Sequence, residues 1–400
     1  MDERRRPGNG AYASSPVVTD PIPPAPVSPA AIGATAPHGG RSERRGMSAP
    51  IWEMAVLVVL LIGLVAYLLT YLGVVASAVG MVLALIPLTV VLLAVRAADR
   101  WEPEPASLVV FALAWGAIAA VAIALGVDIA LDALAPAPPD DAARDAFSSV
   151  VQAPLVEEFA KGLGVFLVFV FGRRAFDGPV DGVVYGALVG AGFAFTENIL
   201  YFATSLIEGG LSETAFTFVL RGILSPFAHV MFTAVTGYAI GRAARAGATV
   251  RAAAGAGLVG MLCAAALHAL WNGSALFADF FHLYITLQVP LFIAFVLGFI
   301  ALRREEARLT RQRLGEYAQA GWFTPAEVDL LATGSGRRRA TAWARTLPGD
   351  RSRQMKTFIA EATSLAAARQ RASTGRDPGA VADERARLGR TVAARAALFA

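Results

Sequence analysis

The stretch PLVEEFAKGLGVFLVFVFG, from Pro154 to Gly172, places two adjacent glutamates and a lysine near the start of an otherwise apolar segment. A helix in a soluble protein turns such residues toward water. The run from Leu163 to Phe171 that follows has no polar face. The fold therefore depends on whether this chain lies in a membrane.

The composition indicates that it does. The chain is 56% hydrophobic and 16% charged, with a mean hydropathy of +0.55, whereas soluble domains are about 25% charged. Apolar runs of about 17 to 25 residues, long enough to span a bilayer, recur between Ile51 and Leu302. We predict an all-α polytopic membrane protein with about eight transmembrane helices, at 51–71, 74–95, 106–133, 149–172, 180–203, 215–241, 254–277 and 284–302.

The arginines indicate how the spans are oriented. They cluster before the first span and after every second one, at Arg41, Arg44, Arg45, Arg96, Arg100, Arg173, Arg174, Arg242, Arg245, Arg251, Arg303 and Arg304. The loops on the other side, 134–148, 204–214 and 278–283, contain only Arg144. The positive-inside rule then predicts a multi-pass protein of the cell membrane with both termini in the cytoplasm. Topology thus explains the net charge of +4, and no pattern typical of nucleic-acid binding is present.

The two ends of the chain differ from the middle, 49–302, which we predict to be one transmembrane domain. Residues 1–48 are rich in Pro, Gly, Ala and Ser, which predicts a disordered cytoplasmic tail. Because this tail has no apolar core like that of a signal peptide, the first span is also the expected anchor. Residues 303–400 are rich in Arg and Ala and predict a small cytoplasmic helical region, with a capping box from Thr324 to Glu327 and helices near 337–346, 351–371 and 381–398. Its basic character suits either anionic lipid headgroups or solubility alone.

The charges of the opening stretch are costly inside a bilayer. About thirteen apolar residues contribute about −4 to −8 kcal/mol to insertion, while three central charges cost about +7 to +10 kcal/mol. The charges must therefore pair, be protonated or line a cavity that contains water. Lys161 is spaced to pair with Glu157 and with Glu158. It is one of only two lysines in a chain that otherwise uses arginine, so a compact ammonium is expected to matter here.

Further polar residues fall at a similar depth in three other spans. Glu197 and Asn198 lie in 180–203, His229 lies in 215–241, and His268 and Asn272 lie one turn apart in 254–277. We expect four helices to bring these side chains into one layer in the outer half of the membrane. Small residues at a spacing of four predict close packing of the fifth span against a neighbour: Gly182, Gly186 and Gly190.

This group of residues supports more than one chemistry. A glutamate can activate water while a histidine donates a proton and Asn198 or Asn272 stabilises an oxyanion. Alternatively Glu158, His229 and His268 can bind Zn²⁺, with the remaining glutamate as the base. No HExxH motif is present to favour the metal. A proton or cation relay in a transporter or channel, and a non-catalytic scaffold held by ion pairs, are the alternatives to an enzyme.

The order of the motifs carries a family resemblance. EEFAK at 157–161, GFAFTENILYF at 192–202, PFAHVMFTAVTGYAIG at 226–241 and HALWN at 268–272 follow DRWEPEP at 99–105. Together they resemble the PrsW family of intramembrane proteases over roughly 96–302, and more distantly the type II CAAX prenyl endopeptidases.

The resemblance implies hydrolysis of a membrane-protein substrate that has a transmembrane helix, such as an anti-sigma factor in stress signalling. It implies that Glu157 and Glu158 are the catalytic pair, with His229 and His268 as partners and Asn272 as an oxyanion donor; Glu197 and Asn198 match the family's second motif. The prenyl endopeptidases have an arginine in the neighbourhood where this chain has Lys161. Many members of the PrsW family are labelled metalloproteases, and the sequence leaves the metal open.

Overall fold

The computed structural model describes residues 51–400 except 101–102, 135–141, 174, 278–279 and 376–378. The predicted disordered tail, 1–48, lies outside the described residues. Within the described part the chain is helical with no strand, as predicted. The elements are α2 (Ile51–Tyr71), α3 (Gly73–Ala98), α4 (Ala106–Ala114), η1 (Trp115–Ala120), α5 (Val121–Leu134), α6 (Ala142–Phe147), η2 (Ser148–Gln152), α7 (Ala153–Phe171), α8 (Pro179–Phe218), η3 (Val219–Leu224), α9 (Ala228–Arg245), α10 (Val250–Phe277), α11 (Phe280–Leu283), η4 (Tyr284–Gln288), α12 (Val289–Gln319), α13 (Pro325–Ala332), α14 (Gly334–Thr346), α15 (Ser352–Ser373) and α16 (Ala380–Ala396).

Five helical stretches of the described chain are long and apolar enough to cross a membrane: Gly73–Ala98, Ala106–Leu134, Pro179–Arg245, Val250–Ser274 and Phe280–Gln319. Ala55–Tyr71 is apolar but shorter, and α7 carries three charges in its first half. These helices are those of a polytopic membrane protein. The count of eight spans stays a prediction.

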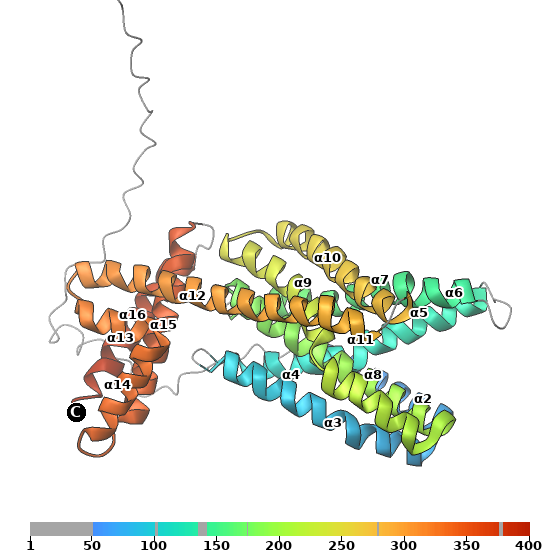
Figure 1. Ribbon diagram of the computed structural model, residues 1–400. Helices are drawn as coiled ribbons and strands as arrows, with labels where there is room; N and C mark the ends of the chain where they lie inside the picture. Colours follow the sequence, from blue (N-terminus) through green and yellow to red (C-terminus); the bar gives the residue numbers. More distant parts are fainter. Residues whose placement is uncertain (1–50, 101–102, 135–141, 174, 278–279, 376–378) are drawn as a thin grey trace, which may run out of the picture.

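The longest of these stretches contains a reversal of the chain. Gly210 has φ 65° and ψ −157° inside α8, a left-handed conformation that glycine adopts at little cost. The chain runs along α8 to this point and returns through η3 and α9, as the green and lime helices of Figure 1 show. The fifth and sixth predicted spans thus form an antiparallel pair.

Glycines bring α8 and α9 into backbone contact. A Cβ atom at Gly182 would lie 2.0 Å from the carbonyl oxygen of Gly237, and one at Gly190 would lie 2.4 Å from the carbonyl oxygen of His229. No larger residue fits at either position without moving a helix. The predicted stripe of small residues therefore sets the register between α8 and α9.

The π-helical segment η1 holds α7 and α8 together. The indole Nε1 of Trp115 donates to the carbonyl oxygen of Ala160 on α7 at 3.0 Å, and the indole fills the space that Gly164 leaves open. On the other side, the hydroxyl of Thr196 on α8 donates to the carbonyl oxygen of Ala117 at 2.7 Å. These bonds fix the polar turns of α7 and α8 relative to each other.

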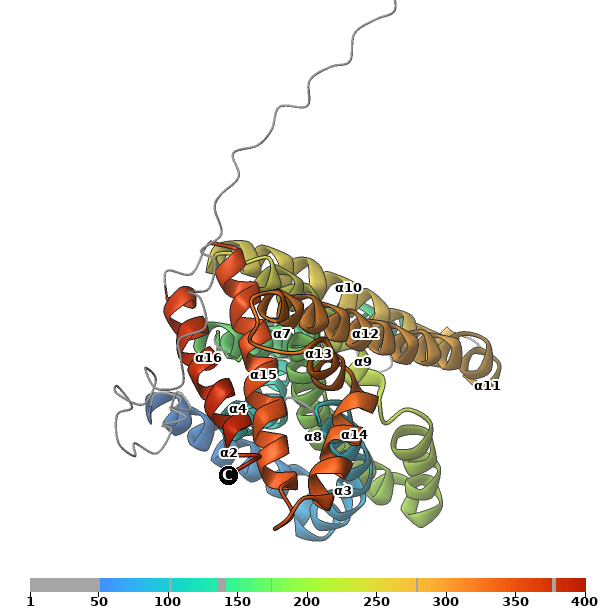
Figure 2. The ribbon, with the colours of Figure 1, turned by 90° about the vertical axis from the view of Figure 1, so that its left-hand side faces the viewer.

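The C-terminal helices form a second hydrophobic core. Helix α12 continues without a break from the apolar bundle, and α13–α16 pack around its far half; Figure 2 shows them across one end of the molecule. Their shared core includes Leu314, Tyr317, Phe323, Leu331, Phe358 and Leu365. The predicted capping box is confirmed, because the Thr324 hydroxyl accepts from the backbone N–H of Glu327 and the Glu327 carboxylate accepts from that of Thr324.

Candidate functional site

The charges of α7 pair with one another. The ammonium of Lys161 lies 3.0 Å from Oε2 of Glu157 and 2.8 Å from Oε1 of Glu158. The side chains of Lys161 and Glu158 have no exposed surface, whereas 12% of the Glu157 side chain is exposed. The spacing along one helix therefore produces the expected ion pairs, and the two glutamates have different surroundings.

Glu158 is held from three helices. Its Oε1 also lies 3.2 Å from Nδ1 of His268 on α10, and its Oε2 accepts a hydrogen bond of 3.1 Å from Thr233 on α9. Glu157 contacts Lys161 through Oε2, and its Oε1 has no hydrogen-bond partner among the described residues. Glu158 is consequently fixed in place, while Glu157 keeps an unused oxygen.

His229 connects the ion pairs of Lys161 to a further carboxylate, Glu197. Its Nδ1 lies 3.0 Å from the Lys161 ammonium, and its Nε2 lies 2.7 Å from Oε2 of Glu197 on α8. Because an ammonium can only donate, Nδ1 accepts, and Nε2 carries the proton that is donated to Glu197. The three protons of Lys161 are thus directed at Glu157, Glu158 and His229.

Arg221, which was not among the predicted site residues, completes the network. From η3 it donates to Glu197, and its Nε donates to Oδ1 of Asn198 at 2.9 Å. Its guanidinium stacks 3.8 Å above the ring of Tyr201. The signal was present, since an arginine inside an apolar span is rare and usually functional.

His268 and Asn272 share a face of α10, as predicted, but they have different partners. The ring of His268 is buried and stands 5.0 Å from the ring of His229 at 85°. The amide of Asn272 donates to the backbone carbonyl of Ser149 in η2 at 2.9 Å. In this structure the amide nitrogen expected to stabilise an oxyanion is therefore engaged.

A small cavity of about 50 Å³ adjoins the network. Its wall includes Glu197, Asn198, Arg221, His229, His268 and Asn272. One or more water molecules fit in such a volume, since each needs about 10 to 15 Å³. A peptide does not fit.

The same group of residues includes a set of side chains that could bind a metal ion. Ligand atoms of Glu157, His229 and His268 all lie within 4.8 Å of one another, and two histidines with one glutamate form a donor set found in catalytic zinc sites. The set differs from the predicted one in its glutamate, because the oxygens of Glu158 face Lys161, Thr233 and His268. The residue types fit a divalent ion, and the Lys161 ammonium competes for Glu157 and His229.

The region of the chain that holds this site is similar to a family of known proteins. Residues 104–297 match the PrsW family, described as intramembrane metalloproteases. Protease PrsW of Geobacillus kaustophilus is 36% identical over 146 residues, which are 36% of this chain and 58% of the relative. Protease PrsW of Oceanobacillus iheyensis is 39% identical over 92 residues, 23% of this chain and 39% of the relative.

The match to a less similar relative covers slightly more of both chains. Protease PrsW of Clostridioides difficile is 28% identical over 160 residues, 40% of this chain and 64% of the relative. The chain thus spans between 39% and 64% of the length of these three relatives. No solved structure matches it. Residues 104–297, which match the PrsW family of intramembrane metalloproteases, contain every side chain of the site described above.

Proposed function

We propose that this protein is an intramembrane protease that hydrolyses peptide bonds of membrane-protein substrates. The observation that carries the proposal is the buried network in which Lys161 links Glu157 and Glu158 to His229, beside a cavity large enough for water. Charged groups inside an apolar bundle are costly and are typically functional. The family match supports the same activity.

We further propose the topology in which it acts. The protein spans the cell membrane eight times with both termini in the cytoplasm, as the arginine distribution predicts. The site then lies in the outer half of the bilayer, and the scissile bond lies in or near that half. Membrane-bound regulators of the anti-sigma type are the substrate class that the family resemblance favours.

Glu157 is the proposed general base. It is the glutamate with a carboxylate oxygen to spare and with partial exposure. It takes a proton from water, the resulting hydroxide adds to the peptide carbonyl carbon, and the proton passes to the leaving nitrogen as the C–N bond breaks. Glu158 is a positioning residue that holds Lys161 and His268.

Donors for the developing oxyanion line the cavity. Arg221 and Asn198 line it together with His268. Donors arranged before the reaction stabilise such a charge by several kcal/mol in other hydrolases. Asn272 joins them in this role when its bond to Ser149 opens.

A divalent ion is compatible with this site. Glu157, His229 and His268 would hold it, and zinc in such a position polarises a carbonyl and makes bound water more acidic. Within this chain the Lys161 ammonium supplies positive charge to two of these side chains, Glu157 and His229.

Access requires movement of both partners. The cavity of about 50 Å³ holds water but no peptide. In addition, a helical peptide carbonyl is already hydrogen-bonded within its own helix. A substrate helix must therefore unwind locally, and the helices around the cavity must separate to admit it.

The direct test compares protein N-termini in host cells that express the wild type, Glu157→Gln or Glu208→Gln at equal abundance. Glu208 lies on α8 with Glu197 but is exposed, so it is the matched control. We expect new N-termini close to transmembrane segments in the wild type and the control, and a loss of about 10²-fold or more in Glu157→Gln.

Identical N-terminal profiles in all three strains would contradict proteolysis. Proton or cation flux through the reconstituted protein would then test the relay alternative.

A further inference from the structure

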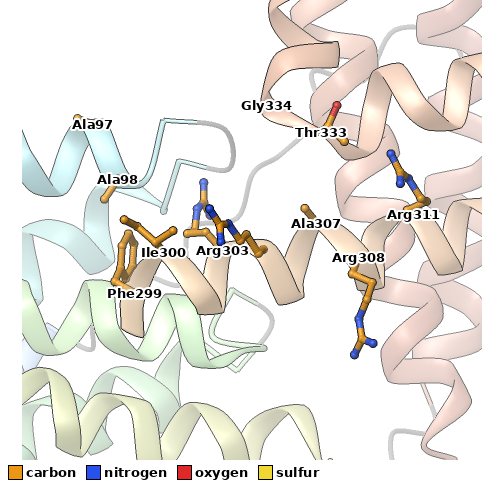
Figure 3. Close-up of a pocket in the computed structure, with 11 residues that line it drawn as sticks. Ala97, Ala98, Phe299, Ile300, Arg303, Ala307, Arg308, Arg311, Thr333 and Gly334 are labelled. Atoms are coloured by element: carbon orange, nitrogen blue, oxygen red, sulfur yellow. The ribbon is translucent and has the colours of Figure 1, made fainter. Parts of the chain in front are cut away.

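A second, larger cavity lies at the junction between the apolar bundle and the C-terminal helices. Its volume is about 610 Å³. Figure 3 shows it between the end of α3, the middle of α12 and the start of α14, lined among others by Ala98, Phe299, Ile300, Arg303, Arg304 and Gly334. It is remote in the chain from every residue of the proposed protease site, and its α12 and α14 walls lie beyond the PrsW match, which ends at residue 297.

The α12 side of this cavity changes from apolar to basic along the helix. Phe299 and Ile300 are apolar, and the next turns carry Arg303, Arg304, Arg308 and Arg311. At 1.5 Å per residue the change from Phe299 to Arg311 takes about 18 Å. The apolar part continues a face of α12 with large exposed side chains, at Ile293, Val296, Leu297 and Ile300. Such a face suits lipid chains, and the arginines follow where headgroups begin.

Half of these arginines have carboxylate partners and half do not. Arg303 pairs with Glu306 at 2.7 Å, and Arg311 pairs with Asp329 at 3.1 Å. Arg304 and Arg308 are exposed and have no ion-pair partner among the described residues. The cavity therefore has uncompensated positive charge.

The opposite wall adds backbone donors. Helix α14 begins at Gly334, and the Thr333 side chain caps it by accepting from the N–H of Gly336. The first N–H groups of a helix lack partners within it and attract anions. In Figure 3, Arg303 lies in the space between Ala98 and Gly334, and Arg311 is near Thr333. Arg308 points to the other side of α12, at the rim of the cavity.

We propose that this cavity binds the headgroup of an anionic phospholipid, with its acyl chains along the apolar face of α12. Basic pockets at the cytoplasmic ends of transmembrane helices bind such headgroups. A soluble anion would use the arginines but not the apolar wall of Ala98, Phe299 and Ile300. The bound lipid would connect α3 and α12 to α14, and so join the membrane bundle to the C-terminal helices.

The test uses the purified full chain in a non-ionic detergent, with bound lipid counted by native mass spectrometry. Dioleoylphosphatidylglycerol is titrated, and dioleoylphosphatidylcholine and inorganic phosphate are run in parallel. The variant is Arg304→Gln with Arg308→Gln; both side chains are exposed and have no ion-pair partner among the residues that the structure describes, so that folding is preserved. The matched control is Arg338→Gln with Arg339→Gln, two exposed arginines on α14 outside the cavity.

We expect the anionic lipid to bind the wild type and the control alike, and the Arg304/Arg308 variant about 30-fold more weakly, at about 1 kcal/mol per arginine. Phosphatidylcholine is expected to bind weakly to all three. Equal binding by wild type and variant overturns the proposal, as does an equal loss in the control pair. Complete displacement of the lipid by millimolar phosphate would also overturn the proposal, because it would show that the cavity binds a soluble anion.

Discussion

The apolar bundle and the C-terminal helices place their charged side chains in opposite ways. In the bundle, Lys161 and Glu158 point inward and have no exposed surface. Around the C-terminal core, pairs such as Arg390 with Glu361 stay at the surface, with 44% and 28% of their side chains exposed. The surrounding solvent decides whether a charged side chain points inward or outward, because lipid offers no partner to a charge and water does. A polar side chain is therefore informative in the first region and ordinary in the second.

The two regions also pack differently. Backbones touch through glycines between α8 and α9, whereas large side chains such as Leu314 and Phe358 fill the C-terminal core. Helices in lipid gain little from burying more apolar surface, so close approach stabilises them instead. Helices in water gain from each buried side chain. The same substitution is therefore expected to have opposite effects in the two regions.

The largest expected contrast is between two ion pairs. Lys161→Met leaves two buried carboxylates without their cation, and we expect the free energy of unfolding to fall by about 3 to 5 kcal/mol. Arg390→Gln breaks an exposed pair and is expected to cost less than about 1 kcal/mol. Denaturant titration in mixed micelles, followed by circular dichroism, measures both. Similar losses in the two variants would show that the buried network does not stabilise the bundle.

Packing provides the next contrast. Gly182→Leu forces a side chain into the carbonyl of Gly237, so we expect the free energy of unfolding to fall by about 1 to 3 kcal/mol. Gly126→Leu on α5 is the matched control, because a Cβ atom there meets nothing within 4 Å. Thermal unfolding midpoints in detergent compare the two. A midpoint unchanged by Gly182→Leu would mean that α8 and α9 separate easily.

We expect the free energy of unfolding to depend on pH through Asp99, which lies at the junction between the two regions. Burial raises the pKa of Asp99 from 3.8 to about 6, while the nearby Glu306 also raises it and Arg303 lowers it. The folded state thus binds this proton more tightly than the unfolded state does. The protonated Asp99 carboxyl therefore contributes to the stability of the fold. This contribution is fully present below about pH 4 and is lost as the pH rises through 6.

Asp99→Asn tests this directly, since an asparagine oxygen can still accept from the backbone N–H of Glu104. Between pH 4 and 7, we expect the free energy of unfolding of the wild type to fall relative to that of the variant, by on the order of 1 kcal/mol. Unfolding curves at several pH values provide the measurement. Parallel pH profiles would be evidence against the shifted pKa.

The smallest contrast compares two alanine substitutions. Gly389 lies inside α16 with open space around its Cα, so Gly389→Ala is expected to stabilise the C-terminal helices by about 0.5 to 1 kcal/mol. Gly190→Ala is expected to destabilise the bundle, because the new Cβ would lie 2.4 Å from the carbonyl oxygen of His229. Unfolding midpoints of the two variants should shift in opposite directions. Shifts of the same sign would remove the distinction between the two kinds of packing.

The sequence alone determined the properties that depend on local spacing and on solvent. Apolar runs predicted the helices, and the spacing along α7 predicted the pairs of Lys161 with Glu157 and Glu158. The capping box at Thr324 was equally local. The motifs indicated the family, which the match over residues 104–297 bears out.

Only the tertiary structure decided how the two adjacent glutamates differ. Glu158 receives partners from α9 and α10, so Glu157 keeps the unused oxygen and groups with His229 and His268. The inclusion of Arg221 likewise depends on the return of the chain after Gly210. These contacts join helices far apart in the chain, and the backbone contacts of α8 and α9 set the register that brings them together. The spacing of glycines within α8 predicted close packing, but it did not identify the partner helix or the residues that meet there.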